Sequence, residues 1–367
     1  MLKRLGTWLF VFFIACAPVV LDANASPIDL LSVEDQNLSG TSGSVFLGSI
    51  GNDDQIAAIE NAVDEFRTKS TLTQNGVSKL ELFYRGIIAG PNDPRLPAHF
   101  MRWRELFPNS PTPIVLEAHV RLAGVLNSFS LDGFSKADRQ ATVPKRALID
   151  KLRAYIVKNH LIAASDPHWY LLRLRLSLIE GQRGSHTSLL LAEALDRFPR
   201  YKALYAAAAD IHLPRWGGSA DALELWAREV DEKQQQKNVL GGYALTYLQA
   251  FENEYGNDLF VRSNINWDRF EQSWQHLERD GAGKHFQAIA ALVACVAGDH
   301  AMAKRLFKNS GSALYGTIAG SRPGANACVV WAEKTEWQLF VEETRADLQP
   351  YLAYVLAIID LILLRGR

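Results

Sequence analysis

The chain has 367 residues, which is enough for one extended repeat domain or for two ordinary domains. Its content of 48% hydrophobic and 22% charged residues is typical of a folded globular protein and excludes a disordered one. The formal net charge of −1 gives no basic excess, so composition offers no support for a nucleic-acid partner.

The first 25 residues have the layout of a secretory signal peptide. Lys3 and Arg4 form a positive region, residues 8–16 are apolar, and small residues lead up to Ala25. We therefore expect a periplasmic or secreted protein that is cleaved after Ala25. Two alternatives stay open, namely an uncleaved N-terminal anchor and a lipoprotein attached at Cys16.

The mature chain is predicted to begin with a flexible arm over residues 26–52, which are rich in Ser, Gly and Asp and lack a sustained period. From residue 53 to 345, apolar residues recur at helical spacing and predict a helical-repeat domain. The expected helices include Asp53–Lys69, Lys79–Ile88, Trp103–Phe107, Pro113–Leu126, one from Pro144, one from Pro167 to near Gly181, Gly241–Tyr255, one capped by Asn266, Phe286–Ala297 and His300–Phe307.

The stretch Ser188–Val230 indicates how these helices are arranged. It predicts three helices joined by turns at Phe198-Pro199 and at residues 214–218, because proline ends a helix. The small residues Ala206–Ala209 allow a neighbouring helix to approach closely. We predict an all-α fold, specifically an irregular tetratricopeptide-like α-solenoid of stacked helix pairs. Residues Asp258–Val261 are the only weak strand pattern.

The last residues, 346–367, predict an apolar C-terminal helix. Tyr351–Leu364 is apolar except for Asp360, and fourteen residues are too few to span a bilayer comfortably. We expect this helix to close the core or to pack against a partner subunit. The alternative is peripheral membrane contact through the same helix.

Two cysteines remain once the leader is removed, Cys295 and Cys328. In an oxidising compartment they are able to form a disulfide. Cys295 also lies in an apolar run, where a buried free thiol is common. Both interpretations stay open, because spacing in the sequence does not establish proximity.

Several motifs resemble the bacterial domain of unknown function 4034 family over roughly residues 100–310. These are His168-Trp169-Tyr170, Leu191–Leu195 with Phe198-Pro199, Leu213–Ser219 and Ala294–Asp299. The resemblance implies a tetratricopeptide-like all-α fold and, because that family has no established activity, no function. The chain departs from the family pattern after Ala118.

No catalytic or metal-binding motif is present in the sequence: there is no His-Glu-x-x-His pair, no Gly-x-Ser-x-Gly elbow and no complete phosphate-binding loop. We accordingly expect no cofactor. The best candidate site is the turn after the second helix of Ser188–Val230, with Asp210, His212, Arg215, Trp216, Gly217 and Gly218.

This turn has two interpretations. Its glycines let backbone N–H groups converge ahead of a helix N-terminus, where an anion is favoured, and Arg215 would clamp a carboxylate or phosphate. Alternatively, Trp216 fills the core, Arg215 pairs with an internal acceptor, and the glycines supply positive φ.

The leading functional hypothesis is an exported scaffold that binds a protein or peptide in the cell envelope. The first alternative is an envelope hydrolase with Asp210, His212 and Arg215 in one pocket. The second is a membrane-associated assembly factor that uses the apolar C-terminal helix.

Overall fold

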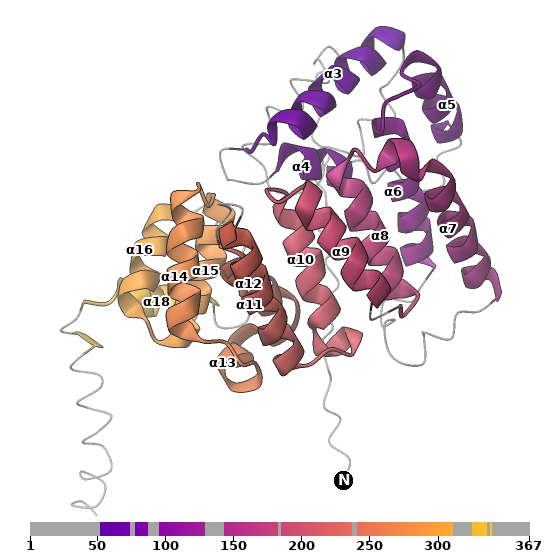
Figure 1. The fold of residues 1–367 in the computed structure, drawn as a ribbon. Coiled ribbons are helices and arrows are strands. Elements are labelled where there is room, and N and C mark those ends of the chain that lie inside the picture. Colours follow the sequence, from indigo (N-terminus) through magenta and orange to yellow (C-terminus); the bar gives the residue numbers. More distant parts are fainter. Residues whose placement is uncertain are drawn as a thin grey trace, which may run out of the picture. The chain divides into compact units, whose positions relative to one another are not determined.

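The computed structural model describes residues 52–73, 78–86, 95–128, 143–182, 185–236, 241–310, 325–335 and 338–339 (Figure 1). The chain divides into two compact units, unit 1 (Met1–Phe286) and unit 2 (Gln287–Arg367). The predicted signal peptide, nearly all of the predicted arm and the predicted helix at 346–367 lie outside the described residues. The boundaries predicted for one helical-repeat domain, 53–345, stay a prediction.

The elements formed by the described residues are helical. In chain order they are α3 (Asp53–Lys69), α4 (Lys79–Gly86), α5 (Leu96–Leu106), α6 (Thr112–Asn127), α7 (Val143–Ala163), α8 (Pro167–Ile179), α9 (Ser185–Arg197), α10 (Lys202–His212), η2 (Pro214–Trp216), α11 (Ala220–Gln236), α12 (Gly242–Ala250), η3 (Phe251–Tyr255), η4 (Gly256–Asp258), α13 (Leu259–Arg262), α14 (Trp267–Arg279), α15 (Lys284–Ala297), α16 (His300–Ser310) and α18 (Ala325–Glu333).

The all-α class is therefore confirmed. Within the described residues, the one extended feature is an isolated bridge between Leu72 and Ser78. The weak strand pattern at Asp258–Val261 is wrong, because these residues end η4 and form most of the short helix α13. Leu259 is buried there, and Asp258 faces Arg262 one helical turn later. The segment is thus stabilised by local helical contacts and needs no neighbouring strand.

Side-chain caps explain where several helices begin. Asn52, Asp166 and Asn266 each accept a hydrogen bond from a backbone N–H in the first turn of α3, α8 and α14, respectively. Ser219 accepts from the N–H of Ala222 at the start of α11. The cap predicted at Asn266 is thus confirmed, and Asp166 and Ser219 cap their helices in the same way.

In unit 1, helices pack on their sequence neighbours and also on the helix after next. Helices α6, α8, α10, α12 and α14 each contact the following member of this series, and α7, α9 and α11 pack beside them (Figure 1). Ala207, Ala208 and Ala209 are buried, which lets α10 contact both α8 and α12. The solenoid arrangement itself stays a prediction.

Large aromatic side chains fill the interior of unit 1. Trp103, Trp169 and Trp274 are fully buried, and Trp226 is nearly so. Trp267 is only half-buried and stacks on Phe270, with ring centroids 5.3 Å apart. Its position as the first residue of α14 keeps it at the edge of the packed layer.

A buried polar network lies among these aromatic side chains. The carboxylate of Asp166 has no solvent exposure and accepts hydrogen bonds from Arg67 Nε at 2.8 Å, from the Tyr84 hydroxyl at 2.7 Å and from the N–H of His168 at 2.8 Å. Because a buried charge is costly unless it is paired, these donors are what permits the carboxylate to be buried. Asp166 therefore connects α3, α4 and α8.

The network continues to α5 and α6 through Arg67 and Thr112. Arg67 Nη2 donates to the Thr112 hydroxyl at 2.7 Å, and that hydroxyl donates to Glu60 at 3.1 Å. Glu60 also accepts from the indole N–H of Trp103 and from the Ser110 hydroxyl, both at 2.6 Å. Two buried carboxylates, one on α3 and one at the start of α8, thus hold five helices of unit 1 together.

Two buried histidines extend the network to α10. His168 stacks on Tyr84 with ring centroids 4.4 Å apart, and its Nε2 lies 3.1 Å from Nδ1 of His119 on α6. Nδ1 of His168 lies 3.0 Å from the hydroxyl of Tyr201, which directly precedes α10. Each of these rings is thereby fixed in orientation by its neighbours.

Unit 2 is held by one covalent link. Cys295 on α15 and Cys328 on α18 form a disulfide, with Cα atoms 5.8 Å apart. Beside it, His300 on α16 contacts the ring of Trp331 edge-on, and its Nε2 lies 3.1 Å from the Trp331 carbonyl oxygen. The structure thus shows that the two cysteines are paired, which their spacing in the sequence does not establish.

None of the helices in the described part of the chain is long and apolar enough to cross a bilayer.

We predict that Asp166→Asn destabilises the protein by about 3–5 kcal/mol, because the substitution removes the buried counter-charge of Arg67 and leaves only its ion pair with the exposed Asp64. Urea unfolding at neutral pH measures this change. The matched control is Glu65→Gln, which removes an exposed ion pair with Lys69 on α3 and is expected to cost less than about 0.5 kcal/mol. Equal effects of the two substitutions would contradict the role given to the network.

Reduction of the disulfide is expected to destabilise unit 2 by about 3–4 kcal/mol, because a loop of 33 residues is released in the unfolded state. Amide hydrogen exchange with and without a reductant measures this locally. Exchange should accelerate in α16 and α18 and stay unchanged in α6 and α8. Unchanged exchange in α16 and α18 would show that the disulfide does not stabilise unit 2.

Candidate functional site

The turn predicted as a site lies between α10 and α11 and is tightly built. Gly217 has φ +80°, a conformation that glycine adopts without strain. Gly218 has ordinary φ, but a Cβ there would overlap the backbone carbonyl of His212. The expectation of positive φ thus holds for Gly217, whereas Gly218 is required by close packing. Trp216 is half-buried, so it does not fill the core.

Asp210 and Arg215 face the helical segment 242–255. Asp210 accepts from Asn253 Nδ2 at 2.7 Å and from Gln249 Nε2 at 3.3 Å, and burial raises the pKa of its carboxyl. Arg215 Nε donates to Glu254 at 2.7 Å. These bonds use the side chains internally, which matches the interpretation in which Arg215 pairs with an acceptor of the protein.

His212 points to the other side of α10. Its ring stacks on Trp226 of α11 with centroids 5.3 Å apart, and burial lowers its pKa to about 4. Residues two positions apart in a helix do not face each other, which explains why Asp210 and His212 diverge. Asp210 and Arg215 thus lie on the side of residues 242–255, close enough for Arg215 to act on the Asp210 carboxyl, whereas His212 contacts α11. The hydrolase hypothesis stays a prediction.

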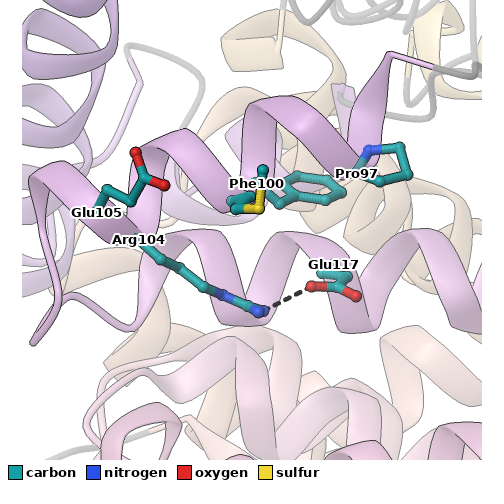
Figure 2. Close-up of a pocket in the computed structure, with 6 residues that line it drawn as sticks. Pro97, Phe100, Arg104, Glu105 and Glu117 are labelled. Carbon is teal, nitrogen blue, oxygen red and sulfur yellow. Dashed lines mark hydrogen bonds and ion pairs between the residues drawn. The ribbon is translucent and has the colours of Figure 1, made fainter.

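A cleft lies elsewhere in unit 1, between α5 and α6. It has a volume of about 430 Å³, and Figure 2 shows the side chains around it. Its lining residues are Pro97, Phe100, Met101, Arg104, Glu105 and Glu117.

The cleft combines an apolar part with a charged wall. Phe100 is buried, whereas the neighbouring Met101 is 62% exposed. Arg104 and Glu117 face each other across the cleft, with Nη2 and Oε2 2.6 Å apart (Figure 2). The cleft is therefore suited to a ligand whose apolar group packs on the apolar part and whose polar group bonds to the charged wall.

The charged wall is supported from behind by α7. The Tyr155 hydroxyl contacts both Arg104 and Glu117, and its oxygen lies 3.0 Å from Oε2 of Glu117. The guanidiniums of Arg104 and Arg121 lie over the Tyr155 ring, at 5.7 and 4.7 Å from its centroid. Burial and the nearby Glu117 raise the pKa of Tyr155, so it stays a neutral donor at physiological pH.

Arg104 also carries an unused donor. Its Nε is shielded from solvent and has no hydrogen-bond partner within the described residues. A buried donor without an acceptor costs free energy, which favours any ligand that brings an acceptor to Arg104.

No group of three or more His, Cys, Asp or Glu side chains in the described ranges is arranged to hold a metal ion. The expectation that the protein uses no cofactor stays a prediction.

The sequence predicts a helix at Trp103–Phe107 but carries no signal for the cleft, although Phe100 and Arg104 are one helical turn apart. The missing information is the position of α6, because Glu117 comes from a different helix and its distance to Arg104 depends on packing.

Comparison of the chain with models of known families, with curated proteins and with solved structures gives no match. The resemblance to the domain of unknown function 4034 family therefore stays a prediction.

The lowered pKa of His212 predicts a pH dependence of stability. The folded protein resists protonation of this ring down to about pH 4, whereas an unfolded histidine binds a proton near pH 6.5, so stability falls as the pH decreases through this window. We expect the decrease in Tm between about pH 7 and 5 to be smaller in His212→Gln than in the wild type. His276→Gln, on α14, should retain the full decrease; an identical decrease in His212→Gln would refute the assignment.

Proposed function

We propose that the protein is an exported helical-repeat scaffold of the cell envelope and that the α5–α6 cleft binds a peptide segment of a partner protein. The observation that carries this proposal is the exposed Met101 beside the paired Arg104 and Glu117. Protein-binding surfaces combine apolar anchors with oriented polar groups in this way.

The chemistry of the cleft indicates what kind of segment it binds. An apolar side chain would pack on Phe100 and Met101, and a carbonyl or carboxylate of the same segment would supply the acceptor that Arg104 Nε lacks. Because Arg104 is already oriented by Glu117 and Tyr155, little side-chain freedom would be lost on binding.

Two further observations support an exported location. The first 25 residues have the pattern of a signal peptide, with small residues before the cleavage point at Ala25. The disulfide between Cys295 and Cys328 fits an oxidising compartment, where such bonds persist. The proposal of membrane contact through residues 346–367 rests on sequence alone.

A photo-reactive amino acid placed at position 101 tests the cleft in intact cells. We expect one discrete crosslinked product from position 101 and none from position 225, because Leu225 on α11 is an apolar side chain of similar exposure, 68%, outside the cleft. The same products from both positions, or none from position 101, would contradict the proposal.

Met101→Asp is expected to weaken binding of the crosslinked partner by about 10- to 100-fold, which corresponds to roughly 1.5–3 kcal/mol of lost apolar burial. Binding of the purified partner to the purified variant measures this. Leu225→Asp is the matched control and should bind like the wild type.

A further inference from the structure

A second surface in unit 1, formed by α7, α8 and α9, contains more hydrogen-bond donors than acceptors. Its charged and titratable side chains are His160 on α7, Arg173 and Tyr170 on α8, and Glu193 and Arg197 on α9. With His160 neutral, two guanidiniums face one carboxylate, and the cluster carries one excess positive charge.

Arg173 has the least ordinary environment in this cluster. Its Nη1 is shielded from solvent and has no hydrogen-bond partner within the described residues. Burial lowers the pKa of Arg173, against the opposing effect of Glu193. A half-buried guanidinium with an unused donor decreases the stability of a protein unless something else supplies the acceptor.

The single carboxylate of the cluster is already engaged. Glu193 accepts from the Tyr170 hydroxyl at 2.5 Å and lies 3.6 Å from Arg197 Nη1. The hydrogen bond from Tyr170 and the cations around Glu193 lower the pKa of its carboxyl. Glu193 therefore holds Tyr170 and Arg197 in place, and among the described residues Arg173 has no direct ion pair.

The aromatic side chains fix the positions of the donors. The guanidiniums of Arg173 and Arg197 lie 5.7 and 5.8 Å from the centroid of the Tyr170 ring. The indole N–H of the buried Trp169 points at Nδ1 of His160, 3.4 Å away. That contact leaves the other ring nitrogen, Nε2, to carry the proton of the neutral ring as a donor.

We propose that Arg173, Arg197 and His160 form a binding site for an oxyanion, that is, for the carboxylate, sulfate or phosphate group of a small ligand. Such a group brings the acceptors that the cluster lacks and neutralises its excess charge. This site is separate from the α5–α6 cleft, so the proposal does not depend on the function proposed above.

The site is expected to bind more tightly in acid. Burial, Arg173 and Arg197 lower the pKa of His160, against the effect of Glu193, so the ring is neutral at pH 7. A bound anion offsets the two guanidiniums and favours protonation, and by linkage protonation favours the anion. Sulfate is the suitable probe, because its own charge does not change between neutral and mildly acidic pH.

Sulfate titration at constant ionic strength, with chloride as the balancing ion, tests the proposal on the full-length protein. The indole N–H resonance of Trp169 reports on the site through His160. We expect saturable binding that is at least about threefold tighter near pH 5.5 than near pH 7.5. Titration with acetate then distinguishes a preference for carboxylate from one for tetrahedral oxyanions.

The variants Arg173→Gln and Arg197→Gln should each weaken sulfate binding by at least about tenfold. Arg153→Gln on α7 is the matched control, since it removes the same charge from an arginine that is already paired with Glu180 and Asp150. It should bind like the wild type. Arg173→Gln should also have an unchanged or higher Tm, because the substitution removes a buried donor that has no partner. An unchanged or higher Tm shows that any loss of sulfate binding is not caused by unfolding.

A linear, non-saturating response would show general screening by the salt and would overturn the proposal. Equal loss of binding in Arg173→Gln and Arg153→Gln would do the same. A Tm for Arg173→Gln well below that of the wild type would show that Arg173 has a structural partner and would remove the argument from its unused donor.

Discussion

The carboxylate of Asp166 lies out of contact with water, and three donors from α3, α4 and α8 compensate for its burial. Because a charge in this position is tolerated only when every partner is in place, the three helices are not free to move independently. Through Arg67 and Thr112 the same constraint reaches Glu60, whose other oxygen holds the indole of Trp103 on α5. The network thus fixes the relative positions of helices that are far apart in the sequence.

This constraint also determines the geometry of the cleft. Trp103 lies between Phe100 and Arg104 in the sequence, so the hydrogen bond that its indole N–H donates to Glu60 orients the helix that carries one side of the cleft. Ser110 and Thr112, which also bond to Glu60, fix the start of α6 and thereby the position of Glu117. The two surfaces that we propose for binding differ in this respect, since the oxyanion cluster on α7, α8 and α9 is held by Tyr170 and Trp169 instead.

Local signals in the sequence predicted the fold well and the candidate sites poorly. The α3 boundaries and the cap at Asn266 follow from residues close together in the chain. The ion pair of Arg104 with Glu117 and the bond of Arg67 to Asp166 join residues 13 and 99 positions apart, and no periodicity encodes those distances. Asp166 illustrates both cases: its role as a helix cap was predictable, whereas its role as the centre of a buried network depends on packing.

The most direct test of the account is amide hydrogen exchange in the variant Glu60→Gln, which keeps the shape of the side chain but removes its charge. If the network positions the cleft, exchange should accelerate in α5 and in the first turn of α6, while the amides of α12 and α14, which do not contact Glu60, keep their wild-type rates. Unchanged exchange in α5 and α6 would contradict the claim that the buried carboxylates hold the cleft in place.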